Sequence, residues 1–284
     1  MAYEQGRIAS GDVDIFYRKF GKPGAVPLIL FHGGNYYDSV DWIDVATALS
    51  HDREVVSFDG RGFGESGWSS SKDYSHAAQM GDAMALLDHL GWHSAIAVGH
   101  SRGGAYALLM ASRFPERTGG LVIIDYCPGF GIGPRGMPIV MTQSIDNTFR
   151  VFHDARAALA STSRYGYAPG DTARRERFES LLRETDGGVV IAKRDPDFAN
   201  QVPTLPSAFA PLQVGDMWEE LSKVHVATLI FRASKSKAGY MAEDIARLRQ
   251  DYPQIQLVEI ESDHDVVAEA PDALVAEVAA WLKE

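Results

Sequence analysis

The segment Gly99–Gly103 carries the residue types that nucleophilic catalysis needs. It reads Gly-His-Ser-Arg-Gly, with Ser101 at its centre. An apolar strand is expected directly before it, at 95–98, and a helix directly after it, to about Phe114. Such a strand-to-helix turn raises the serine hydroxyl above the sheet and places helix N–H groups beside it. The pattern predicts a nucleophilic serine, although a serine that caps a helix would share the short motif.

The elements that must position this serine alternate between strand and helix over the first 125 residues. Apolar runs fit strands that are covered on both faces, and the segments between them have helical spacing, as at 75–90. This order predicts a parallel sheet with right-handed crossovers. The expected strands are 27–31, 54–58, 95–98, 121–124, 228–231 and 256–260.

The alternation stops after Asp125 and resumes at 228. The residues between contain Gly- and Pro-rich stretches and amphipathic segments, but no clear apolar strand. We therefore expect a core of residues 1–127 and 224–284, and a mainly helical cap of residues 128–223 inserted after the fourth parallel strand.

With motifs at 32–34, 59–66, 99–103 and 263–266 in this order, the chain resembles the α/β-hydrolase superfamily. It is most similar to the esterase, lactonase and C–C hydrolase branch that carries a cap. The resemblance implies the α/β-hydrolase fold, a mostly parallel sheet with helices on both faces. It also implies that the backbone N–H groups of Gly34 and Arg102 hold the oxyanion, unless Gly33–Gly34 is a plain turn.

The resemblance places the general base after the last strand, where His264 stands. A loop histidine that caps the final helix is the alternative interpretation. The family's acid usually follows the strand expected at 228–231, but Lys237 occupies the expected aspartate position. Some similar haloalkane dehalogenases carry the acid at the end of the preceding strand, which implies Asp125 as the acid. That aspartate also fits a purely structural acceptor.

Two other arrangements of the acid remain open. Ser101 and His264 would form a dyad if Ser234 or Ser236 oriented the histidine. Alternatively, Glu243 or Asp244 would fold back to His264, or the protein would have a weakened or a different activity. Asp263 and Asp265 flank His264, and neighbours in sequence usually point away from each other.

The expected activity is hydrolysis of a carboxylic ester or lactone of a moderately large, partly apolar small molecule through an acyl-enzyme on Ser101. Hydrolysis of a C–C bond in a diketone-like substrate is the alternative, and a non-catalytic ligand receptor is a third hypothesis. The residues expected to contact substrate are Tyr36, Tyr37, His100, His153 and Trp218.

Composition excludes several other classes. The formal charge of −11 disfavours nucleic acid and anionic membranes, because both need clustered positive charge. Cys127 is the only cysteine, so no intrachain disulfide can form. The glycine-rich segment 59–67 lacks the Gly-Lys-Ser/Thr ending of a P-loop. We expect a cytoplasmic monomer or homodimer without metal or cofactor, signal peptide or membrane span.

Overall fold

The computed structural model describes most of the expected core and parts of the insertion. The described residues are 3–34, 37–129, 176–177, 179–184, 190–195, 197–198, 217–236 and 240–284.

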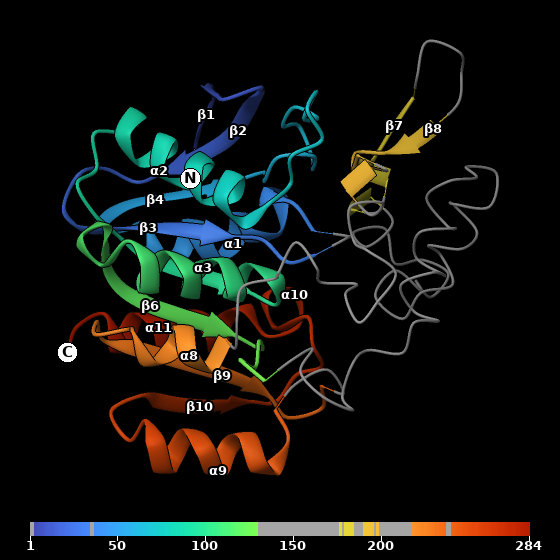
Figure 1. The fold of residues 1–284 in the computed structure, drawn as a ribbon. Coiled ribbons are helices and arrows are strands. Elements are labelled where there is room, and N and C mark those ends of the chain that lie inside the picture. Colours follow the sequence, from blue (N-terminus) through green and yellow to red (C-terminus); the bar gives the residue numbers. More distant parts are fainter. Residues whose placement is uncertain are drawn as a thin grey trace.

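One mostly parallel sheet organises the core (Figure 1). Its order is β1-β2-β4-β3-β5-β6-β9-β10. The first two strands form a hairpin and β2 pairs with β4 antiparallel, while all pairs from β4 to β10 are parallel. This confirms the expected α/β sheet. The strands are β1 (Glu4–Ser10), β2 (Val13–Phe20), β3 (Ala25–Phe31), β4 (Arg53–Phe58), β5 (Ala95–His100), β6 (Thr118–Ile124), β9 (Thr228–Ala233) and β10 (Gln256–Ile260).

Helices cover both faces of this sheet because its central strands are apolar on both sides. Side chains alternate along each strand: Ile29 of β3 packs in the core cluster with α2, α3, α8 and α9, and Leu30 in the cluster with α1, α10 and α11. The helices are α1 (Ile43–Leu49), α2 (His76–His89), α3 (Arg102–Arg113), α8 (Met217–Ser222), α9 (Ala242–Asp251), α10 (Val266–Glu269) and α11 (Pro271–Trp281), with short 3-10 turns η1 (Ser39–Trp42) and η2 (Pro115–Arg117).

The described parts of the insertion differ from the expected helical cap in two ways. Strands β7 (Leu182–Glu184) and β8 (Val190–Ala192) form a small antiparallel sheet. Helix α8 joins the core, because Met217 and Leu221 are buried in the cluster that α3 shares with the sheet. The expected boundary at 223 is therefore too late: the chain has returned to the core by Met217.

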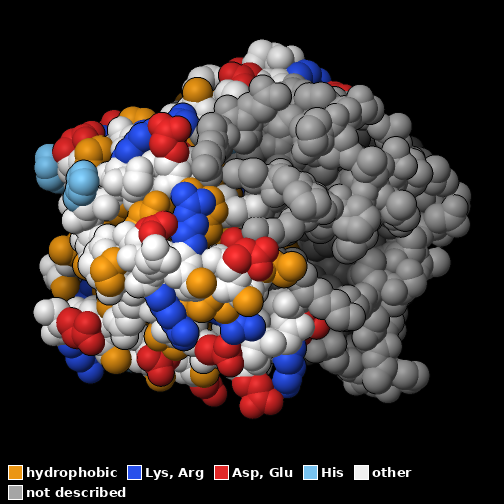
Figure 2. Space-filling model, turned by 60° about the horizontal axis from the view of Figure 1, so that its bottom comes forward, with side chains coloured by type: hydrophobic (Ala, Val, Ile, Leu, Met, Phe, Trp, Pro, Cys, Tyr) orange, Lys and Arg blue, Asp and Glu red, His pale blue; other side chains and the backbone are white. Residues whose placement is uncertain are grey.

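The surface of the described core mixes acidic and basic side chains, as Figure 2 shows for one face. No helix in the described part of the chain has the length and apolarity that crossing a membrane requires.

Candidate active site

Ser101 occupies a strained turn between β5 and α3. Its backbone φ is +53°, a conformation that residues other than glycine rarely adopt. Its N–H donates to the carbonyl of Ile124 at 2.9 Å, which ties the turn to the end of β6. The flanking glycines are required by space: a Cβ on Gly99 would lie 2.0 Å from the oxygen of Gly103, and one on Gly103 would lie 2.1 Å from the oxygen of Phe31.

The three side chains singled out in the sequence form one hydrogen-bonded chain. The Oγ atom of Ser101 lies 2.9 Å from Nε2 of His264. The Nδ1 atom of His264 lies 2.7 Å from Oδ2 of Asp125. Serine, histidine and aspartate come from the ends of three different strands, β5, β10 and β6. This geometry allows Nδ1–H to donate to the carboxylate, which leaves Nε2 free to accept the serine proton.

Asp125 is held rigidly at the end of β6. Its φ is +46°, its side chain is fully buried, and its N–H donates to the carbonyl of Phe231 on β9 at 2.9 Å. Its Oδ1 atom accepts the N–H of Ala233 at 3.1 Å, so Oδ2 faces the histidine. Burial raises the pKa of Asp125. The hydrogen bond and charge of His264, together with the N–H of Ala233, lower the pKa by more than burial raises it, so the pKa lies below its ordinary value. The acid is therefore ionised at neutral pH.

The other candidate acids have different partners or positions. Asp244 accepts the N–H of Met241 at 2.9 Å and so caps the first turn of α9. Asp263 accepts the backbone N–H of His264 at 2.8 Å rather than the ring proton. Ser234 is exposed. Among the described residues, Asp125 is the carboxylate whose geometry orients the imidazole.

A buried histidine holds the turn at residues 32–34, which is expected to form the oxyanion hole and is called the oxyanion turn below. The Nδ1–H of His32 donates to the carbonyl of Gly33 at 2.7 Å, and its Nε2 accepts the N–H of Gly60 at 3.0 Å. Burial, followed by the positive charge of Arg102, lowers the pKa of His32 to about 4, so the ring is neutral at pH 7. Gly34 follows this anchored turn, and Arg102 begins α3, where N–H groups have no acceptor within the helix.

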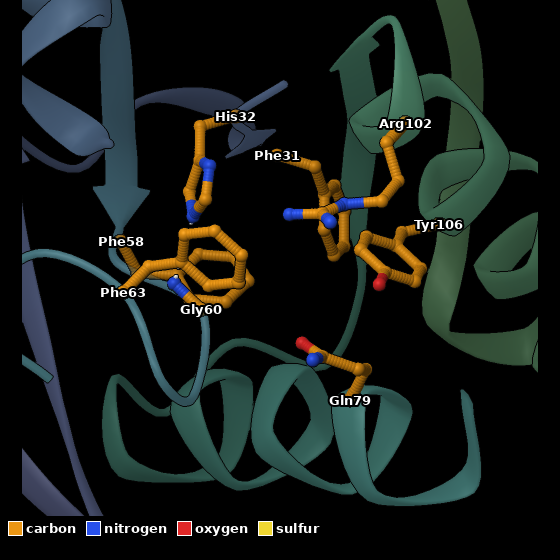
Figure 3. A pocket seen from close by; sticks show the side chains of 8 residues that line it. All are labelled: Phe31, His32, Phe58, Gly60, Phe63, Gln79, Arg102 and Tyr106. Atoms are coloured by element: carbon orange, nitrogen blue, oxygen red, sulfur yellow. Dashed lines mark hydrogen bonds between the residues drawn. The ribbon is translucent and has the colours of Figure 1, made fainter. Parts of the chain in front are cut away.

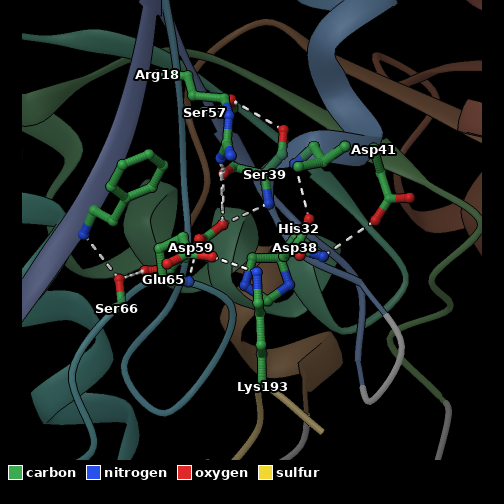
Figure 4. Close-up of polar contacts among 12 residues, drawn as sticks. Arg18, His32, Asp38, Ser39, Asp41, Ser57, Asp59, Glu65, Ser66 and Lys193 are labelled. Atoms are coloured by element: carbon green, nitrogen blue, oxygen red, sulfur yellow. Dashed lines mark hydrogen bonds and ion pairs between the residues drawn. The ribbon is translucent and has the colours of Figure 1, made fainter. Parts of the chain in front are cut away.

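A second polar network fixes the glycine-rich segment beside this turn (Figure 4). Asp59 follows β4 and accepts the N–H of Ser39 at 2.7 Å and that of Glu65 at 2.8 Å. The backbone N–H of Phe16 donates to Ser66 at 2.8 Å. Burial and the negative charge of Asp38 raise the pKa of Asp59 to about 6. Segment 59–67 therefore supports the oxyanion turn from the side of His32.

This geometry can be compared with known proteins. Residues 26–271 match the family model described as the alpha/beta hydrolase fold. The chain belongs to the α/β-hydrolase family.

Individual relatives and solved structures with similar sequences or folds include named hydrolases. A bifunctional esterase/perhydrolase from Acinetobacter calcoaceticus is 32% identical over 51% of this chain and 56% of that protein, so the match spans about half of that relative. A 2-(acetamidomethylene)succinate hydrolase from Mesorhizobium japonicum is 28% identical over 88% of this chain and 85% of that protein. The solved structure of E-2-(acetamidomethylene)succinate hydrolase has a TM-score of 0.81 at 22% identity and covers 100% of both chains. Both relatives are named for hydrolytic activities, and the solved structure shows that the two proteins share a fold.

Two residues expected to contact substrate are instead buried beside His264 and Gly33. His100 is only 1% exposed, and its Nε2–H donates to the carbonyl of His264 at 2.7 Å. Tyr37 is also buried and packs edge-on against the ring of His100, at 5.0 Å between centroids. This packing corrects the expectation that His100 contacts substrate, because its side chain supports the backbone of His264. Tyr37 packs behind the oxyanion turn, against Gly33.

Trp218 is also buried, and its contacts are with side chains of the core. It is 4% exposed, stacks on Tyr252 at 6.0 Å between ring centroids, and lies under the guanidinium of Arg247. These contacts join α8 to the α9 side of the core. The expectation that Trp218 lines the substrate pocket is therefore corrected to core packing.

The remaining predicted positions lie outside the described residues. These are Tyr36, His153 and Lys237. Within the described ranges, no group of three or more His, Cys, Asp or Glu side chains is arranged to hold a metal ion.

The side chain of Arg102 is the feature of the site that sequence reasoning missed. The resemblance to the family implied a role only for its backbone N–H. In the structure, its guanidinium lies between the rings of Phe63 and Phe198, which come from distant segments. The sole signal in the sequence was an arginine directly after the nucleophile.

Proposed function

We propose that this α/β-hydrolase cleaves a carboxylic ester or lactone through an acyl-enzyme on Ser101. The observation that carries the proposal is the continuous chain of hydrogen bonds from Ser101 through His264 to Asp125, at 2.9 and 2.7 Å. Nucleophile, base and acid in this geometry are the requirements of acyl transfer. The hydrolase names of the relatives agree with it.

The reaction has two halves. Ser101 attacks the substrate carbonyl while Nε2 of His264 takes the hydroxyl proton, and the N–H groups of Gly34 and Arg102 stabilise the oxyanion. When the tetrahedral intermediate collapses, the bond to the leaving oxygen breaks and His264 returns the proton to that oxygen. Water then attacks the acyl-enzyme with the same base. This step regenerates Ser101 and releases a carboxylic acid.

A fluorophosphonate probe tests the proposal directly. We expect stoichiometric labelling of the wild-type protein at Ser101, and no labelling of Ser101→Ala. Ser112→Ala is the matched control, because Ser112 lies on α3 and its hydroxyl is bonded to Glu220 at 2.6 Å. It should be labelled like the wild type. Absence of labelling in the wild type would contradict the proposal and favour a ligand receptor on the same fold.

A substrate panel then defines the reaction class. The purified protein would be given alkyl and aryl esters, lactones and β-diketones, with product acids measured by chromatography. Turnover of esters or lactones that is lost in Ser101→Ala is the expected result. Turnover of β-diketones alone would replace the proposal with C–C bond hydrolysis.

A further inference from the structure

The side chain of Arg102 is enclosed beside the nucleophile. The residue is 8% exposed. Its guanidinium carbon lies 4.6 Å from the ring centroids of both Phe63 and Phe198. Phe63 belongs to the segment after β4, and Phe198 belongs to the insertion. The two rings meet edge to face at 4.8 Å between centroids, so they hold the guanidinium in one position.

Among the described residues, this buried cation has no anionic partner. No carboxylate of the described residues lies within ion-pair distance of the guanidinium, and its Nε atom is buried without a hydrogen-bond partner. Burial lowers the pKa of Arg102 from its ordinary value, yet arginine stays protonated in proteins. A buried charge with no counter-charge is costly, and proteins keep such groups mainly where they act on a ligand.

The acidic groups near the oxyanion turn are engaged elsewhere. Asp38 and Asp41 are paired with Arg177, at 2.9 and 2.8 Å. The carboxylate of Asp59 accepts the backbone N–H groups of Ser39 and Glu65. The positive charge of Arg102 therefore remains available to an incoming anion.

The guanidinium faces a small cavity that also presents neutral donors (Figure 3). The polar ends of Gln79 on α2 and Tyr106 on α3 point into the same space as the guanidinium. The walls are aromatic, so water competes weakly for these donors. The wall residues are Phe31, Phe58 and Phe63.

The cavity adjoins the place where the reacting carbonyl would lie. A Cβ on Gly34 would be 3.5 Å from the guanidinium carbon of Arg102. The backbone N–H of Arg102 is one of the two proposed oxyanion donors, so the same residue serves both places. The guanidinium therefore lies beside the backbone of Gly34, the residue expected to donate the other oxyanion N–H.

We propose that the Arg102 guanidinium binds a carboxylate of the substrate, so that the substrates are anionic esters or lactones, such as half-esters of short dicarboxylic acids. The planar fork of arginine matches a carboxylate through two parallel hydrogen bonds. Gln79 and Tyr106 supply further donors to the same anion. This inference rests on the proposed serine hydrolysis and narrows its substrate class.

Paired substrates test the inference. Monomethyl malonate, succinate and glutarate would each be compared with the corresponding dimethyl ester, which differs by one charge. The wild type should favour at least one half-ester in kcat/KM. In Arg102→Met the ratio of half-ester to diester kcat/KM should fall by about 30-fold or more, because a buried charge pair is lost. A preference of the wild type for all three diesters, or an unchanged ratio in Arg102→Met, would overturn the inference.

A matched control separates this effect from a general loss of positive charge. Arg113→Met removes an arginine from the same helix, but Arg113 is 40% exposed and pairs with Glu220 at 3.1 Å. Its half-ester to diester ratio should equal that of the wild type. A fall as large as that of Arg102→Met would assign the preference to the overall field of α3 and overturn the inference.

Binding and stability give readouts that do not depend on turnover. Ser101→Ala should bind at least one of the three half-esters in calorimetry, and adding Arg102→Met should weaken that binding about 30-fold or more. Because no catalysis is needed, this measurement stands even if the fluorophosphonate experiment rejects the serine mechanism. Arg102→Met should also raise the thermal midpoint, since an unpaired buried charge is removed. A lowered midpoint together with unchanged binding would show that the guanidinium serves only the fold.

Discussion

At the scale of single residues, Asp125 shows that a carboxylate at the end of β6 can reach His264. Strands β6 and β9 are parallel neighbours, with Ile124 paired to Phe231. Their carboxyl ends therefore lie side by side, and Asp125 donates its N–H to Phe231. A carboxylate at the end of either strand can reach a histidine in the loop after β10. Lys237 at the usual acid position is thus compatible with a complete triad.

Replacing Asp125 with Asn tests this assignment. The amide retains an oxygen for the N–H of Ala233, but its NH₂ group cannot accept the Nδ1 proton of His264. The imidazole then takes the wrong tautomer, and kcat should fall by about 10⁴-fold. The measurement is kcat for the best ester of the panel. Asp263→Asn, which changes the adjacent exposed carboxylate, should stay within a few fold of the wild type; a wild-type rate in Asp125→Asn would assign that residue a structural role.

At the scale of elements, the junction of β5 and α3 explains why the nucleophile lies between glycines. Helix α3 crosses so close to β3 that Gly103 lies against the carbonyls of Phe31 and His32. This close approach brings the first turn of α3 beside the oxyanion turn. The positive φ of Ser101 is the local strain that accompanies it.

Two glycine-to-alanine changes separate this packing from helix propensity. In Gly103→Ala the new Cβ would lie 2.1 Å from a backbone oxygen, so we expect the free energy of unfolding to fall by about 3 kcal/mol. Gly81 lies in α2 with open space around it, and Gly81→Ala should raise that free energy by about 0.5–1 kcal/mol. Urea unfolding measures both. Equal effects of the two changes would show that α3 can move away from β3.

At the scale of the whole molecule, ion pairs connect the insertion to the core. Arg177 binds Asp38 and Asp41 at the start of η1, just after the oxyanion turn. Lys193 pairs with Glu65 in the glycine-rich segment, and Tyr74 donates to Asp195. These contacts place the described part of the insertion beside the elements that carry the site.

Removing Arg177 should destabilise the protein measurably. Asp38 and Asp41 have 6% exposed side chains, so Arg177→Met would remove the cation that pairs with two nearly buried carboxylates. We expect the free energy of unfolding to fall by about 2–3 kcal/mol, less than for a fully enclosed pair because Arg177 is 18% exposed. Chemical denaturation checks this. Lys235→Met breaks an exposed pair with Glu261 and should cost less than about 1 kcal/mol; an equal cost would show that Arg177 does not anchor the insertion.

Features that depend on short stretches of chain were predictable from the amino-acid sequence. Apolar runs and helical spacing predicted the parallel sheet, and Gly99–Gly103 predicted the turn that presents Ser101. The resemblance to the family implied that the base follows the last strand, where His264 stands. These signals are local, because strand alternation, helix periodicity and a strained turn each arise within a few residues.

Only the tertiary structure decided which distant side chains meet. It selected Asp125 over Asp244, because β6 ends beside β9 and the loop after β10. It also turned His100 inward to support His264, and it enclosed the charge of Arg102 between Phe63 and Phe198. Such contacts join segments far apart in the chain, and no periodicity encodes them. The physical reason is that burial, orientation and charge compensation are properties of the packed fold.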